Sequence, residues 1–159
     1  MSNSLVNTLN FLTALGSGLM AGMFFAFSVF IMTALGRLPP ENGIAAMQSV
    51  NVAILNPIFL IVFMGTALAC IALAIIAMMR WGEPGALFLI VGAAFYLFGV
   101  IVVTMVFSLP LNDSLAAIDS KSAEGTDLWA RYLSIWTGWN HVRSVCSLAA
   151  LASFMMAGR

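Results

Sequence analysis

The stretch from Trp136 to Arg143, WTGWNHVR, gathers side chains suited to acid–base and anion-binding chemistry. His141 is the single histidine of the chain, and an imidazole that exchanges a proton near neutral pH can act as a general base or proton relay. Arg143 and Asn140 carry N–H donors that can hold an anion or a polarised carbonyl oxygen. We therefore predict a catalytic set of His141, Arg143 and Asn140.

The helical period separates these candidates. At about 100° per residue, Trp136, Asn140 and Arg143 lie within an arc of roughly 60°, whereas His141 points about 160° away from Arg143. One helix face therefore cannot direct both the imidazole and the guanidinium at one point. Their cooperation requires a second helix or a kinked entry into the segment.

Arg143 and His141 also have purely structural interpretations. Arg143 lies about eight residues, or about 12 Å, inside an apolar segment. A guanidinium at mid-membrane depth costs at least about 2.5 kcal/mol unless it reaches the interface or is paired. Asp113 or a lipid phosphate could stabilise it, and the indole of Trp139, four residues earlier, could lie beneath it. His141 could be an interfacial histidine bonded to a backbone carbonyl.

Other polar and aromatic residues are expected at the same level of the membrane. The tryptophans either belong to an aromatic belt or stack on a planar substrate. The polar side chains before the second apolar segment and after the third can serve as helix caps or as donors in a pocket. The predicted substrate-binding residues are Trp136, Trp139, Gln48, Asn51, Asn112 and Asp113.

The composition places these residues in an integral membrane protein. The chain is 62% hydrophobic and only 8% charged, whereas soluble domains are roughly 25% charged. Net charge is zero and the six basic residues are scattered, so the sequence predicts no nucleic-acid partner. Cys70 and Cys146 lie in apolar segments, where cysteines usually pack as small hydrophobic residues.

Four apolar segments predict an all-α, four-helix membrane bundle that forms a single domain over residues 1–159. The expected spans are about 9–35, 56–79, 86–109 and 135–157. Short interfacial helices are expected in the connections after spans 1 and 3. A ridge of small residues in the first span, Gly18, Gly22 and Ala26, should let another helix approach closely.

Residues that favour caps and turns set the expected boundaries. Asn56 followed by a proline is typical of a helix start. Pro110 should end the third span, so that Asn112 or Asp113 caps a short helix after it. The last helix should start near residues 125–127, where a glycine is followed by Thr and Asp.

The connections also set the expected topology. An even number of spans puts both termini on one side of the membrane. We expect that side to be the cytoplasm, because the short loop with Arg80 is the usual cytoplasmic kind, and the membrane to be the inner membrane of a bacterium. The N-terminus lacks a basic region, and the apolar run after it is too long for the apolar region of a signal peptide, so we expect it to be retained as the first span.

Cofactor motifs are not found in the sequence. The histidine, cysteine and carboxylate residues do not have metal-ligand spacing, and a lone histidine cannot supply both axial ligands of a haem within one chain. There is no glycine-rich phosphate loop and no covalent flavin or haem attachment motif. We predict no metal site and no tightly bound cofactor.

Four motifs resemble, in order and spacing, those of the anthrone oxygenase-like membrane proteins: GLMAGMFFAFSVFIMTAL, LPPENGIAAMQSVN, LPLNDSLA and WTGWNHVRSV. The resemblance extends from about Leu9 to Ala157, and its last two motifs are the most specific. Some fungal members are assigned to the oxidation of an anthrone to an anthraquinone in polyketide biosynthesis. The resemblance implies a cofactor-independent oxygenase that acts on an electron-rich aromatic ketone or hydroxyaromatic.

Such chemistry requires only a few functional groups from the protein. A base removes a proton from the acidic methylene, a donor stabilises the resulting oxyanion, and an aromatic-lined pocket holds the rings. By this resemblance His141 is the candidate base, and Arg143, Asn140 or Asn112 the candidate oxyanion donor.

A non-enzymatic function is the alternative. The same polar residues would then bind a lipid or a quinone-like molecule, or would contact a larger membrane complex. Under either hypothesis the expected partners are an apolar aromatic small molecule or lipid and the membrane itself. The sequence is also compatible with a homo-oligomer.

Overall fold

The computed structural model describes residues 3–158, and this part of the chain is helical throughout apart from its connections and contains no strand. The all-α prediction is therefore confirmed. The elements in chain order are α1 (Asn3–Ala26), η1 (Phe27–Ile31), α2 (Met32–Gly36), α3 (Pro40–Ala53), α4 (Pro57–Met79), α5 (Ala86–Tyr96), η2 (Leu97–Val102), η3 (Thr104–Ser108), α6 (Leu109–Ala116) and α7 (Ala123–Ala157). The η segments are π-helical turns that join their neighbours into longer continuous helices.

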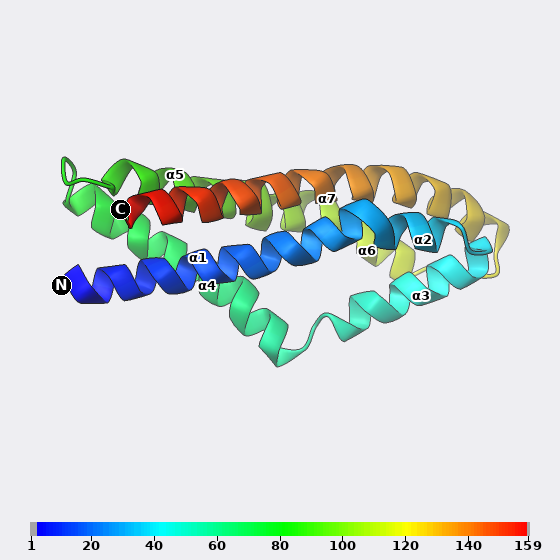
Figure 1. Cartoon of the computed structure of the whole chain (residues 1–159). Coiled ribbons are helices and arrows are strands. Elements are labelled where there is room, and N and C mark those ends of the chain that lie inside the picture. The colour runs from blue at the N-terminus through cyan, green and yellow to red at the C-terminus, as the bar shows by residue number, and fades with distance from the viewer. Residues whose placement is uncertain (1–2, 159) are drawn as a thin grey trace.

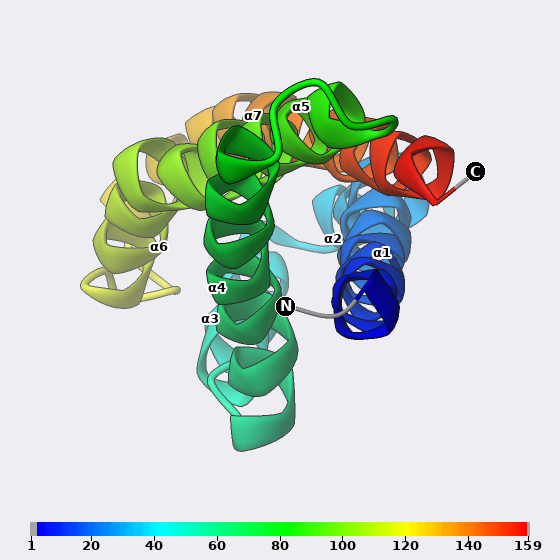
Figure 2. The ribbon, with the colours of Figure 1, turned by 90° about the vertical axis from the view of Figure 1, so that its left-hand side faces the viewer.

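The long helices lie side by side with α7 at the centre of the packing. Helix α7 contacts α1 and α5 along much of its length, and α4 contacts α5 and α1. Figure 1 shows both ends of the described chain at one end of the molecule, together with the short connection between α4 and α5. We call this the terminal end; it is viewed head-on in Figure 2. Helices α2, α3 and α6 lie at the other end, the loop end.

Within the described residues, three helices are long and apolar enough to cross a membrane: Ser4–Gly36, Pro57–Met79 and Ala86–Ala116. Large hydrophobic side chains such as Phe11, Ile61 and Phe98 are exposed on their outer faces, as expected for contact with lipid. These helices correspond to the first three predicted spans and fit an integral membrane protein. The fourth predicted span lies within α7, whose mean hydropathy is lowered by polar side chains on its buried face.

Side-chain caps precede helices α4 and α7. Asn56 accepts a hydrogen bond from the backbone N–H of Phe59 at 3.0 Å, which confirms the predicted start of α4. Ser122 caps α7 in the same way by accepting from the N–H of Gly125 at 2.9 Å. The prediction that α7 begins at residues 125–127 was therefore wrong, because the cap is the serine three residues before the glycine.

Pro110 does not end the third span, which corrects a second boundary. The helix runs on through Pro110 to Ala116. A proline lacks an N–H and crowds the carbonyl one turn earlier, and the π-helical segment Thr104–Ser108 immediately before it provides the wider turn that accommodates the ring. Asn112 and Asp113 consequently lie inside a helix and do not cap one. Helix α3 does form a separate short helix after the first span, but α6 is a continuation of the third.

Close helix contacts depend on glycines other than those predicted. A Cβ added at Gly22 would meet nothing within 4 Å, and one at Gly18 would make only ordinary contact with a leucine. A Cβ at Gly16 would instead collide with the side chain of Thr66 on α4, and one at Gly99 would collide with Cys146 on α7. The small residues that allow close approach therefore include Gly16 between α1 and α4 and Gly99 between η2 and α7.

Buried apolar residues form two clusters. The larger cluster joins α1, α4, α5 and α7 and includes Phe24 and Phe154. The smaller one joins α2, α3, α6 and α7 at the loop end and includes Ile44 and Trp136. Polar side chains of α7 lie between them, and these form the candidate site.

Candidate functional site

Arg143 is the centre of a buried polar group on α7. Its side chain is only 5% exposed. One terminal nitrogen donates to Asn140 Oδ1 at 2.9 Å, and the other lies 3.4 Å from Thr104 Oγ1 on η3. The guanidinium carbon lies 4.5 Å from the ring centre of Phe24 and 4.9 Å from that of Trp136. Arg143 is therefore held by neutral oxygens and by two aromatic faces, one from each apolar cluster.

No carboxylate compensates this guanidinium within the described residues. All six acidic side chains of the chain are exposed, and the ion pair that the structure shows joins Arg80 to Glu83 at the terminal end. The expected pairing of Arg143 with Asp113 was therefore wrong, because Asp113 lies on the exposed side of α6. The expectation that Trp139 lies beneath the guanidinium was also wrong, because Trp136 has that position.

Asn140 fixes the position of Arg143 and ties α7 to α1. Its Nδ2 donates to the carbonyl oxygen of Phe24 and to Ser28 Oγ, both at 2.7 Å, while its Oδ1 accepts from Arg143. The residue is completely buried, and both polar atoms of its amide have protein partners. Ser28 Oγ also lies 3.1 Å from Ser144 Oγ. Because its amide is fully committed, we regard Asn140 as a residue that positions the guanidinium.

Tyr132 extends the polar group toward the loop end. Its hydroxyl donates to Asn112 Oδ1 at 2.7 Å and is completely buried with its ring. The amide of Asn51 on α3 faces the same hydroxyl, and Arg143 is close enough to interact with it electrostatically. The ring stacks between Trp129 and Trp136, at centroid distances of 5.6 Å and 5.9 Å.

Tyr132 was not among the predicted residues, because the fourth span was expected to begin at residue 135. The signal was present, since Tyr132, Trp136 and Asn140 follow one another at four-residue intervals and so share a helix face. We call the residues on this face and their partners the interior polar cluster: Arg143, Asn140, Tyr132, Trp136, Thr104, Asn112 and Asn51.

Several buried donors of this cluster have no acceptor. Arg143 Nε and Trp136 Nε1 are buried and lack a hydrogen-bond partner. The nearby hydroxyls of Ser108, one turn after Thr104, and Ser147, one turn after Arg143, are also without a partner. Buried donors without acceptors are rare and destabilising in proteins. The arrangement therefore suits a ligand that brings an electron-rich oxygen atom.

The π-helical segments gather around this cluster. Ser28 belongs to η1, and Thr104 and Ser108 belong to η3. π-Helical turns disturb the regular i→i−4 hydrogen-bond ladder and frequently occur at functional sites. Their placement here is consistent with the Phe24 carbonyl, one turn before Ser28, accepting from a side chain of another helix.

The predicted site residues divide into two groups. Arg143, Asn140, Trp136, Asn112 and Asn51 come together in the interior polar cluster, although their functional roles stay predictions. The remaining four predicted residues lie apart from it.

His141 is exposed on the outer face of α7, and Asp113 is exposed on α6. Trp139 is half-buried and stacks on Phe107 with ring centres 3.6 Å apart. Gln48 donates to the carbonyl oxygens of Leu115 at 2.8 Å and Ile118 at 3.1 Å, so it satisfies the end of α6. The angular separation of His141 and Arg143 expected from the sequence is thus realised in the structure.

Comparison with known proteins identifies the family. A family model described as anthrone oxygenase matches residues 59–153, which is more than half of the chain. The chain belongs to the anthrone oxygenase family. The matched region includes Thr104, Asn112, Tyr132 and the α7 residues of the interior polar cluster, whereas their partners on α1 and α3 lie outside it. Neither a curated protein nor a solved structure matches the chain.

Metal-ligating side chains do not gather in the described part of this anthrone oxygenase family member. Within residues 3–158, no group of three or more His, Cys, Asp or Glu side chains is placed to hold a metal ion. The interior polar cluster itself consists of a guanidinium, amides, hydroxyls and aromatic rings.

Proposed function

We propose that this protein is a membrane-embedded oxygenase that converts the methylene group of an anthrone-like aromatic ketone, or the corresponding carbon of a hydroxyaromatic, into a carbonyl group. The observation that carries the proposal is the buried Arg143, which has neutral partners, no carboxylate and neighbouring donors without acceptors. Such a group of donors can hold the oxygen that becomes negatively charged during the reaction. Membership of the anthrone oxygenase family supports the substrate class.

The proposal includes a four-helix arrangement in the membrane. Helix α7 packs between α1 and α5, and its outward side chains Val145, Leu148 and Met155 are exposed and apolar. These features support α7 as a fourth span. Helix α3 would lie at the membrane interface with Val52 toward lipid, and the termini would lie in the cytoplasm of a bacterium.

The proposed reaction uses dioxygen without a metal or flavin. Loss of a proton from the methylene carbon gives an enolate, whose charge is largely on the ketone oxygen. The enolate passes one electron to O2, and the resulting radical and superoxide combine to form a C–O bond. After protonation, the hydroperoxide loses water as its C–H and O–O bonds break. One oxygen atom of O2 ends in the new carbonyl and the other in water.

In this mechanism Arg143 stabilises the enolate. The free Nε–H of Arg143, with the indole N–H of Trp136, would donate to the ketone oxygen in place of water. Asn140 and Thr104 would hold the guanidinium in a fixed orientation, so that little reorganisation is needed as the charge develops. Stabilising the enolate also makes the methylene proton easier to remove.

The proton acceptor is a separate question. The sequence suggested His141 as the base, but it is exposed on the opposite face of α7 from Arg143, so we do not place it in the reaction. The interior polar cluster contains no imidazole or carboxylate. The oxyanion-binding and proton-accepting roles are therefore tested with separate variants.

Oxygen uptake tests the proposal directly. Purified, metal-stripped protein in nanodiscs is mixed with anthrone or emodin anthrone at pH 6–8, and empty nanodiscs give the rate of spontaneous oxidation. We expect catalysis by the wild type and a loss of about 10²–10³-fold in Arg143→Met, because an oxyanion donor is removed. Arg37→Met, which removes an exposed arginine, is the matched control and should retain activity. A wild type no faster than empty nanodiscs would refute the oxygenase.

The second candidate is a binding protein for a quinone-like molecule. The observation that favours it is the lack of a base beside the donors of the interior polar cluster. A quinone carbonyl would satisfy the same donors without any reaction. Saturable, Arg143-dependent binding of anthraquinone by a protein that consumes no oxygen would support this alternative.

A further inference from the structure

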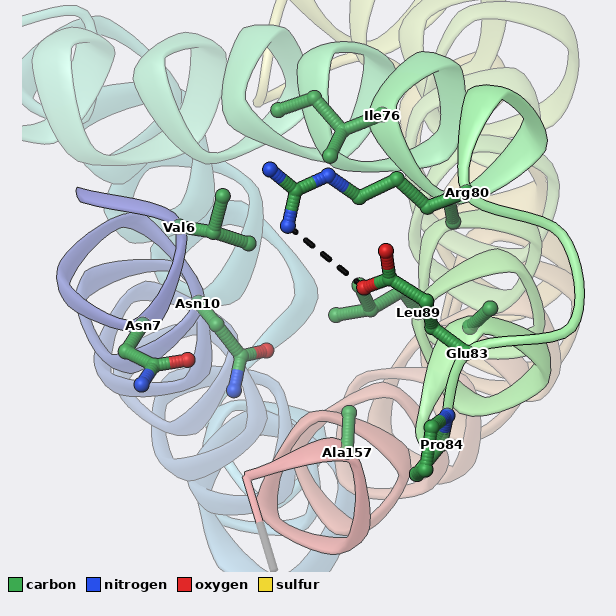
Figure 3. Close-up of a pocket in the computed structure, with 11 residues that line it drawn as sticks. Val6, Asn7, Asn10, Ile76, Arg80, Glu83, Pro84, Leu89 and Ala157 are labelled. Carbon is green, nitrogen blue, oxygen red and sulfur yellow. Dashed lines mark ion pairs between the residues drawn. The ribbon is translucent and has the colours of Figure 1, made fainter. Parts of the chain in front are cut away.

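A cavity of about 280 Å³ opens at the terminal end, remote from the interior polar cluster. It lies among the ends of α1, α4, α5 and α7 (Figure 3). Its apolar lining side chains include Val6, Ile76 and Leu89, polar groups form the rest of its wall, and alanines on α4, α5 and α7 leave the space open. We call this cavity the terminal vestibule. Its volume is close to the lower limit of roughly 300 Å³ that is usual for small-molecule sites.

Asn10 places an unsatisfied acceptor in the vestibule. The residue is only 8% exposed, and its Nδ2 donates to the carbonyl oxygen of Phe154 at 2.9 Å. Its Oδ1 is buried and has no partner. Figure 3 shows this oxygen directed toward the centre of the cavity and the nitrogen directed toward α7. Flipping the amide would set two oxygens against each other, so the acceptor must face the cavity.

Among the described lining residues, Arg80 and Glu83 carry opposite charges and form an ion pair. Arg80 extends across the opening and lies 3.6 Å from the carboxylate of Glu83 (Figure 3). The rim therefore has no net charge from this pair, which favours a neutral ligand over an ion. The guanidinium also lies where it could cover the face of an aromatic ring. Asn7 is a further lining residue, but it is exposed.

We propose that the terminal vestibule binds a small neutral hydroxyaromatic molecule of the phenol or naphthol class. The ligand's hydroxyl donates to Asn10 Oδ1, and its ring lies against Val6, Ile76 and Leu89 beneath Arg80. The ligand supplies a donor to the unsatisfied acceptor and a ring to the apolar side chains of the wall. This site is distinct from the site of the proposed oxygenase reaction and does not depend on that activity.

The test compares a ligand that has a hydroxyl group with one in which a methyl group replaces the hydroxyl hydrogen. Equilibrium dialysis measures 1-naphthol and 1-methoxynaphthalene on protein in phosphatidylcholine nanodiscs, with the uptake by empty nanodiscs subtracted. We expect saturable binding of 1-naphthol at one site and at least about tenfold weaker binding of 1-methoxynaphthalene, which leaves Oδ1 unpaired. Equal binding of the two ligands, or no binding above empty nanodiscs, overturns the proposal.

Matched variants locate the site. Val6→Phe fills the vestibule and should weaken 1-naphthol binding at least about tenfold, whereas Val145→Phe adds the same group on the exposed face of α7 and should change nothing. Asn10→Leu should remove the preference for the hydroxyl; a preference that persists in this variant overturns the contact. If Asn10→Leu does not fold, the Val6 and Val145 variants still decide the location, and equal binding by these two excludes the vestibule.

Two further arms separate this site from other sources of binding. Arg143→Met should leave 1-naphthol binding unchanged, and a loss in this variant would place the ligand in the interior polar cluster instead. Nanodiscs that contain phosphatidylethanolamine should also leave it unchanged. Competition by that lipid would assign the vestibule to a lipid headgroup and overturn the proposed ligand.

Discussion

The interior polar cluster and the terminal vestibule are unsatisfied in opposite senses. In the cluster, Arg143 Nε and Trp136 Nε1 are donors without acceptors. In the vestibule, Asn10 Oδ1 is an acceptor without a donor. Both regions lie among α1, α5 and α7 or their continuations, but at different levels along these helices.

This difference indicates different ligands. A buried polar group without a partner is destabilising, and more so where water is excluded. Buried donors without acceptors are stabilised by an electron-rich oxygen, and the buried Asn10 oxygen is stabilised by a hydroxyl that donates to it. The two regions therefore suit two different ligands, one that presents a ketone oxygen to the cluster and one that presents a phenolic hydroxyl to the vestibule.

The largest effect is expected when the cluster is supplied with an acceptor. Thr104→Asp would place a carboxylate beside the Arg143 guanidinium, since the threonine Oγ1 lies 3.4 Å from it. We expect anthrone-dependent oxygen uptake to fall about 10²–10³-fold while the protein stays folded, because the added carboxylate neutralises the guanidinium charge that stabilises the enolate. Thr104→Asn is the neutral control and should lose far less. Full activity in Thr104→Asp would contradict the role of the donors.

A conservative exchange tests whether the planar fork is needed. Arg143→Lys keeps the positive charge but cannot reproduce the bonds to Asn140 and Thr104 together with a free Nε–H. We expect a loss of about 10–10²-fold in kcat/KM, measured as oxygen uptake at several anthrone concentrations. Wild-type kinetics in this variant would show that only the charge matters.

The extension of the cluster toward the loop end should contribute less. Tyr132→Phe removes the 2.7 Å hydrogen bond to Asn112 but keeps the ring between its tryptophan neighbours. We expect the free energy of unfolding to fall by about 1 kcal/mol and activity to fall by less than about tenfold. Denaturation in detergent and oxygen uptake measure the two effects. A much larger loss of activity with unchanged stability would place the hydroxyl in the reaction itself.

The smallest effect is expected on the outer face of α7. His141 is exposed and makes none of the cluster's contacts, so His141→Ala should change oxygen uptake by less than about threefold. The pH profile of kcat/KM is recorded in the same experiment. Loss of a general base typically costs about 10²–10⁴-fold, and a decrease of that size would assign proton removal to His141 after all.

Features within single helices could be predicted from the sequence. The apolar segments, the cap at Asn56 and the shared face of Trp136, Asn140 and Arg143 all depend on local composition and on the helical period. The same period indicated that His141 points away from Arg143, as the structure shows. Local rules failed at Pro110, because a π-helical turn absorbs the proline.

Features that join different helices were decided by the tertiary structure. In the structure Arg143 contacts Thr104 and Phe24, whereas Asp113 does not contact it. The helical period of α7 cannot predict these partners, because they depend on how the helices are rotated and how closely they approach. Contacts such as that of Gly99 with Cys146 set this approach. The vestibule likewise exists only because the ends of α1, α4, α5 and α7 meet around Asn10, whose amide is oriented by a carbonyl 144 residues later in the chain.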